Sequence, residues 1–140
     1  MMFAPSRDQA RTFLFDTWNK YRRGEALAGL EQTALDVMLL HPEYHAMLEQ
    51  PERYLDRDYG PDSGGLNPFL HLSLHLAIAE QLSIDQPQGI RAHFHRLAQR
   101  LGEHEALHAA LECLAETIWQ AQRLSAPPDQ QAYLDCLERR

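Results

Sequence analysis

Apolar side chains recur every three or four residues along most of the chain, and polar side chains fill the positions between them. This spacing matches the turn of a helix, so it predicts amphipathic helices that each turn one face toward a core. No stretch alternates apolar and polar residues in the way that marks a half-buried strand. The pattern therefore predicts an all-α fold, a single-domain helical bundle of about five or six helices.

Prolines, glycines and capping residues set the expected ends of these helices. The first should cover about residues 7–21, and the second should begin near Ala26 and be interrupted at Pro42. The chain should restart there as a short helix through PEYHAMLEQ, followed by one long loop over 51–66. Further helices are expected from the Asp85 cap to Gly102, over about 103–123 and over about 130–138.

Between the long loop and Asp85, we expect segment 67–83 to form a helix that is apolar on most sides, unlike the amphipathic helices around it. Asn67 suits the N-cap position and Pro68 the first helical position. Apolar side chains cover most of the circumference of this helix, which is typical of a central, buried helix. We therefore expect it to be the hub of the fold, with an apolar surface made of Phe69, Leu70, Leu72, Leu74, Leu76, Ile78 and Leu82.

The two cysteines lie on the last two predicted helices. Cys113 and Cys136 are too few for a zinc ribbon and too far apart for a CxxC redox pair. We expect both to be reduced thiols that pack on helix faces. The buried face of the helix over 103–123 is expected to consist of Leu107, Ala110, Leu111, Leu114, Ile118 and Ala121.

The length and the net charge of the chain limit the number of domains and the kinds of partner that we expect. The chain has 140 residues and a formal net charge of -7, which suits one acidic domain over residues 1–140. An acidic chain argues against the nucleic-acid backbone as the main partner. No segment approaches the roughly 18 consecutive apolar residues of a membrane span, and the start of the chain lacks a signal-peptide pattern. We expect a cytoplasmic protein, for which self-association or a protein partner stays open.

The histidines are spaced far from randomly. Six of the eight fall into pairs four residues apart: His41 and His45, His71 and His75, His104 and His108. Random placement of eight histidines in this chain would produce roughly 0.4 such pairs. Residues four apart lie on the same face of a helix, so both imidazoles of a pair can reach one metal ion. All six are therefore candidate metal ligands.

His71 and His75 are the strongest of these candidates because their helix is apolar on nearly every side. A buried neutral imidazole must hydrogen-bond or coordinate something, since burial without a partner is unfavourable. Neutral imidazole suits a divalent transition metal such as zinc or iron. His41 ranks next because it ends the apolar stripe of Leu30, Ala34 and Val37.

His104 and His108 belong to the segment HEALH, which matches the HExxH pattern of zinc peptidases. In those enzymes the intervening glutamate, here Glu105, activates a water molecule. They also need a third protein ligand and a substrate cleft, and the sequence indicates neither. The pattern therefore names two candidate ligands without predicting peptidase activity.

The run NPFLHLSLHLAIAEQLSIDQPQGIR, with HPEYH before it and IWQAQR and AYLDCLERR after it, resembles the bacterial domain-of-unknown-function family numbered 1841. The resemblance covers almost the whole chain, from SRDQAR to the last helix. It implies a short, free-standing bacterial cytosolic protein. It assigns no activity, substrate or ligand to any residue.

Two functions from different classes stay open at this point. The first is a histidine-rich bundle that binds zinc or iron, with His71 and His75 as its leading ligands. The second is a non-catalytic helical interaction module whose histidines have structural roles. The distances between the imidazoles of the three pairs discriminate between them, because a shared metal needs ligands that converge. Enzymatic activity is not decided by the sequence.

Overall fold

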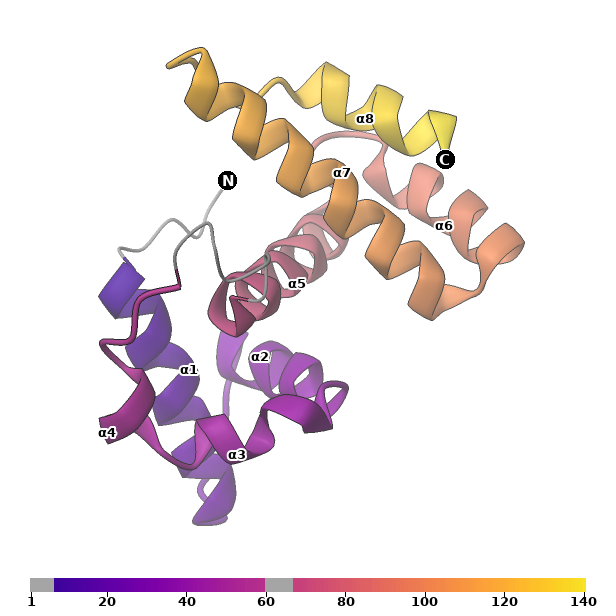
Figure 1. Cartoon of the computed structure of the whole chain (residues 1–140). Coiled ribbons are helices and arrows are strands. Elements are labelled where there is room, and N and C mark those ends of the chain that lie inside the picture. Colours follow the sequence, from indigo (N-terminus) through magenta and orange to yellow (C-terminus); the bar gives the residue numbers. More distant parts are fainter. Residues whose placement is uncertain (1–6, 60–66) are drawn as a thin grey trace. The chain divides into compact units, whose positions relative to one another are not determined.

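The computed structural model describes residues 7–59 and 67–140, and within these ranges every regular element is a helix (Figure 1). The predicted all-α class is confirmed. The elements in chain order are α1 (Arg7–Arg22), α2 (Leu30–Leu39), the short 3-10 helix η1 (Pro42–Tyr44), α3 (His45–Leu48), α4 (Pro51–Tyr54), α5 (Pro68–Ile84), α6 (Ile90–Leu101), α7 (Glu103–Arg123) and α8 (Gln130–Arg139).

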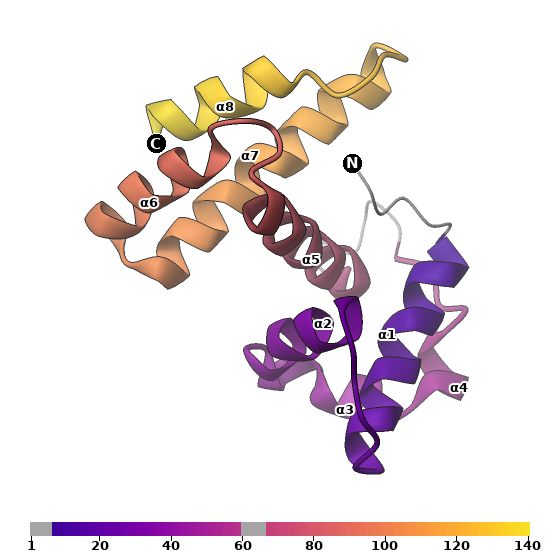
Figure 2. The ribbon, with the colours of Figure 1, turned by 180° about the vertical axis from the view of Figure 1, so that it is seen from behind.

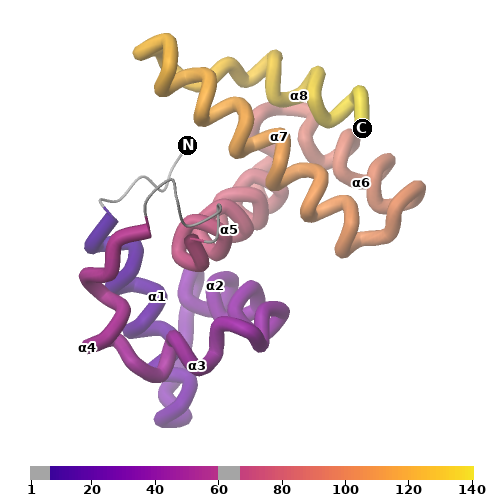
Figure 3. The backbone as a smooth tube through the Cα atoms, viewed as in Figure 1, coloured from indigo at the N-terminus to yellow at the C-terminus, as the bar shows by residue number. Residues whose placement is uncertain are grey.

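The chain divides into two compact units, Met2–Leu76 and Ala77–Arg140. The boundary between them falls inside α5, so each unit contains part of this helix (Figure 2). The tube in Figure 3 follows the chain from α1 to α4 in the first unit and from α6 to α8 in the second. The single domain expected from the sequence stays a prediction.

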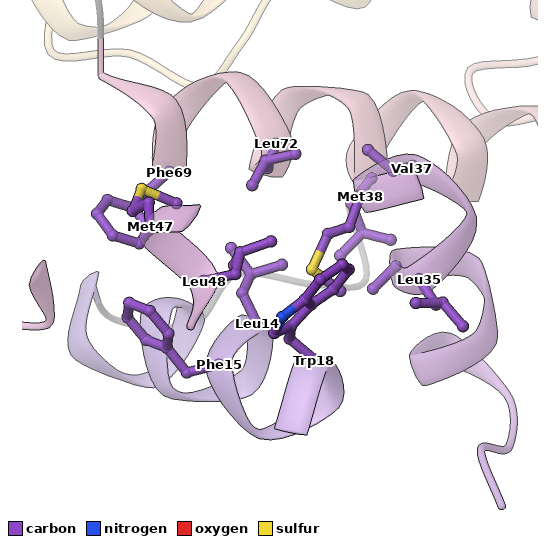
Figure 4. Close-up of a cluster of buried hydrophobic side chains, with 12 residues drawn as sticks. Leu14, Phe15, Trp18, Leu35, Val37, Met38, Met47, Leu48, Phe69 and Leu72 are labelled. Atoms are coloured by element: carbon purple, nitrogen blue, oxygen red, sulfur yellow. The ribbon is translucent and has the colours of Figure 1, made fainter. Parts of the chain in front are cut away.

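A cluster of buried apolar side chains forms the core of the first unit (Figure 4). Trp18 of α1 and Met38 of α2 point toward one another and are 4% and 0% exposed. Phe15 and Phe69 meet edge to face, with their ring centroids 5.6 Å apart. Burial of large side chains from separate helices is the main source of stability in a unit of this size.

Arg11 is an unusual member of this interior, because it is charged and only 2% exposed. Its Nη1 donates hydrogen bonds to the carbonyl oxygens of Leu55 at 3.0 Å and Arg57 at 2.6 Å. The guanidinium also lies 4.3 Å from the ring centroid of Phe69, a cation–π arrangement. Burial lowers the pKa of Arg11 from its usual value. The side chain thus links α1 to the segment after α4.

Two expectations about this unit were wrong. The second helix begins at Leu30 instead of near Ala26, because Gly29 has a φ of 57°, outside helical geometry. The segment 51–66 is not wholly a loop, because Pro51 opens the short helix α4. Residues 60–66 lie outside the described part of the chain.

In the second unit, Asp85 and Gly102 act at the two ends of α6 as the sequence predicted, although α6 begins only at Ile90, and Asp129 is a cap that the sequence analysis did not name. The Asp85 carboxylate accepts hydrogen bonds from the backbone N–H groups of Gly89 and Arg91, at the start of α6. Gly102 ends α6 with a φ of 85°, and the Asp129 carboxylate caps α8 by accepting from the N–H of Ala132. The two carboxylates accept from backbone N–H groups that have no partner within their helix, and the glycine adopts the positive φ with which α6 ends.

The expectation of reduced thiols was wrong, because Cys113 and Cys136 form a disulfide that joins α7 to α8. Their 23-residue separation hides the pairing, which only the packing of the two helices creates. The buried face of α7 also differs from the expected one. It is formed by Ala106, Ala109, Ala110, Cys113, Leu114 and Thr117, since the small side chains allow α6 and α8 to pack closely against α7.

Candidate metal centre

Helix α5 holds His71 and His75 one turn apart on one face. Its start is fixed by Asn67, whose Oδ1 accepts hydrogen bonds from the backbone N–H groups of Phe69 at 3.0 Å and Leu70 at 3.1 Å. This is the N-cap predicted from the sequence, and it satisfies donors that the helix cannot satisfy itself. The imidazole centroids of His71 and His75 lie 4.8 Å apart.

His41 reaches the same place from the junction between α2 and η1. It is not helical, with φ of −126° and ψ of 67°, because Pro42 disfavours helical geometry in the residue before it. His41 is 5% exposed, as expected for the end of a buried stripe. Its Nδ1 lies 2.8 Å from the carbonyl oxygen of Val37, to which it can only donate. The proton of the neutral ring is therefore on Nδ1, and Nε2 presents a lone pair.

The Nε2 atoms of these three histidines converge. Nε2 of His71 lies 3.2 Å from Nε2 of His41 and 3.2 Å from Nε2 of His75. The ring centroids of His41 and His75 are 4.6 Å apart, so the three imidazoles surround one small volume. All three residues belong to the Met2–Leu76 unit.

These distances match the spacing of ligands around a metal ion. Nitrogen ligands about 2.0–2.1 Å from zinc in a tetrahedral arrangement lie roughly 3.3 Å from one another. Hydrogen bonds between the rings explain these Nε2–Nε2 distances less well than a shared metal ion does. A ring nitrogen carries either one hydrogen or one lone pair in its plane, so Nε2 of His71 cannot make two in-plane hydrogen bonds at once. A cation between the rings would satisfy all three nitrogens.

Tyr44 covers one side of this group, and the sequence analysis did not single it out. Its ring is parallel to that of His41 at 5.7 Å and perpendicular to that of His71 at 6.0 Å, between ring centroids. Burial raises the pKa of the Tyr44 hydroxyl. Its position three residues after His41 was the available signal, because η1 returns residue 44 toward residue 41.

His45 does not join this group. Its Nε2 lies 2.7 Å from the carbonyl oxygen of Met38, and its ring packs 4.5 Å from the ring of Trp18. The sequence pattern placed His41 and His45 on one helix face, but the break at Pro42 turns their rings to different partners. His45 thus has a structural hydrogen bond where the sequence suggested a shared ligand pair.

His104 and His108 lie on α7, in the Ala77–Arg140 unit. Their ring centroids are 4.4 Å apart, as the four-residue spacing predicts. His104 and Glu105 are exposed, whereas His108 is half-buried. The role of both histidines as metal ligands stays a prediction.

None of the helices in the described residues has the length and apolar character needed to cross a membrane. Comparison with known proteins finds no matching curated protein and no matching solved structure. A family model described as a domain of unknown function, DUF1841, matches residues 6–139. The chain belongs to the DUF1841 family.

Proposed function

We propose that this chain binds a divalent transition metal through Nε2 of His41, His71 and His75. The observation that supports this proposal is the pair of 3.2 Å distances that Nε2 of His71 makes to the other two nitrogens. The hydrogen bond from His41 Nδ1 to the Val37 carbonyl adds to it, because metal-binding histidines commonly donate their other N–H to a carbonyl oxygen.

Zinc fits this ligand set better than iron does. The metal-ligand group found among the described residues consists of histidines alone, without a carboxylate. Non-haem iron sites in helical bundles usually combine histidines with carboxylates, whereas three neutral imidazoles form a common zinc site. Three imidazoles would supply three of the four ligands of a tetrahedral zinc site, so one further donor would complete it.

Elemental analysis of protein purified without an affinity tag tests the proposal. We expect about one equivalent of metal per chain, the usual content of a single histidine site. The double variant His71→Ala with His75→Ala should lose at least about tenfold in affinity, because two of three ligands are gone. The matched control is His93→Ala with His95→Ala, which removes two imidazoles from α6 and should retain the metal.

Two results of these measurements would contradict the proposal. If wild-type protein refolded with zinc, iron, copper or nickel retains no metal after gel filtration, the proposal is wrong. Equal metal loss in the α5 and α6 double variants would mean that binding is not specific to these ligands. His108→Ala, measured in the same series, tests the separate prediction that α7 supplies a ligand.

The second candidate, an interaction module with structural histidines, is favoured by one observation. His45 bonds to a backbone carbonyl of α2 and packs on Trp18, which is a structural role for a histidine of this chain. If the same explanation held for the whole group, the α5 double variant would lower thermal stability equally with metal and with chelator. Under the metal proposal, added zinc raises the melting temperature of the wild type only.

A further inference from the structure

A cavity lies between α7 and α8, within the Ala77–Arg140 unit and apart from the histidines. Its volume is about 470 Å³, within the range of pockets that hold small molecules. Thr117 and Gln120 of α7, Pro127 and Asp129 of the connection, and Cys136 and Arg139 of α8 are among its lining residues.

The cavity gives access to one side of the disulfide only. Cys136 lines it and is half-buried, whereas its partner Cys113 is 0% exposed. Thr117 also lines the cavity, and its hydroxyl donates a hydrogen bond to the carbonyl oxygen of Cys113 at 2.8 Å. A thiolate that enters the cavity therefore meets sulfur at Cys136 first. Thiol–disulfide exchange depends on which sulfur is accessible to attack.

The charged groups that line the cavity indicate which kind of thiol the cavity can bind. Arg139 contributes a guanidinium, and Glu116 and Asp129 contribute carboxylates. The Asp129 carboxylate is fixed in place because it caps α8, accepting from the N–H of Ala132 at 3.0 Å. A zwitterionic molecule can pair with both signs of charge, its carboxylate with the guanidinium and its ammonium with the carboxylates. A neutral thiol would gain neither interaction.

We propose that this cavity is a thiol–disulfide exchange site for low-molecular-weight amino-acid thiols, independent of metal binding. The incoming thiolate attacks Sγ of Cys136 and forms a new S–S bond. The bond between Cys113 and Cys136 breaks, its electron pair stays on Sγ of Cys113, and that sulfur takes one proton. One thiol and one protein disulfide thus become one mixed disulfide at Cys136 and one buried thiol at Cys113. The reverse attack by Cys113 releases the small thiol again.

The test uses the full chain, first oxidised with glutathione disulfide and then treated with L-cysteine or cysteamine at equal thiolate concentration. Cysteamine lacks the carboxylate that Arg139 would bind. We expect the adduct on Cys136 by peptide mass spectrometry, and L-cysteine to react about two- to fivefold faster, the effect of one exposed ion pair. Arg139→Gln should abolish this preference, and the control Arg100→Gln, on α6, should retain it.

A second variant addresses access to the cavity independently of charge. Ala132 is exposed at the cavity wall, so Ala132→Trp should narrow the cavity and slow both thiols alike without disturbing a buried position. An adduct on Cys113, equal rates for the two thiols in the wild type, or a preference that survives Arg139→Gln would overturn the proposal. So would failure of the oxidised protein to contain the Cys113–Cys136 bond.

Discussion

At the scale of single residues, Arg11 offers a stringent test of the first unit. Arg11→Met retains apolar volume but leaves the carbonyls of Leu55 and Arg57 without their charged donor. We expect a loss of about 1.5–3 kcal/mol in the free energy of unfolding, the range for hydrogen bonds to a charged group. Urea denaturation measures it, with Arg7→Met as the control because Arg7 is largely exposed. Equal effects of the two substitutions would contradict a special role for Arg11.

The three histidines that converge in the structure were all named from the sequence, but the spacing used to name them does not separate them from histidines with other partners. His71 and His75 follow from helical spacing alone, because one continuous helix carries both. His41 and His45 have the same spacing, yet Pro42 directs their rings to different partners. Tyr44 joins through a 3-10 turn, and periodicity does not predict contacts of that kind.

At the scale of elements, the cap of α6 makes folding sensitive to acid. Hydrogen bonds from the backbone N–H groups of Arg91 and Gly89 lower the pKa of Asp85 below its usual 3.8. The stability that the cap contributes is therefore fully present above the unfolded pKa and is lost as pH falls through the lower folded pKa. Asp85→Asn should remove this slope from the acid limb of the unfolding free energy.

Denaturation at a series of acidic pH values measures this slope, and Glu138→Gln is the control because Glu138 is exposed on α8. An acid limb of unchanged slope in Asp85→Asn would contradict the prediction. A cap is also why the sequence predicted the start of α5 closely, because the Asn67 side chain acts locally on the first turn of that helix. The start of α2 was mispredicted because Gly29 has a positive φ, and the buried face of α7 was mispredicted because the packing of neighbouring helices decides it.

At the scale of the whole molecule, the two compact units suggest that perturbing one should leave the other folded. The Cys113–Cys136 disulfide closes a loop within the Ala77–Arg140 unit. Its reduction should destabilise that unit by on the order of 3 kcal/mol, because the unfolded chain regains conformational freedom. Zinc, if it binds through His41, His71 and His75, should instead stabilise the Met2–Leu76 unit.

Hydrogen exchange followed by mass spectrometry separates these effects. After reduction, amides of α7 and α8 should lose protection while those of α1 and α2 keep theirs, since local stability follows the unit that is perturbed. Cys113→Ala with Cys136→Ala, with and without reductant, is the control for the reductant itself. An equal loss of protection in all helices would show one cooperative domain over the chain, as its length and hydrophobic pattern predict, and would mean that the two units do not unfold separately.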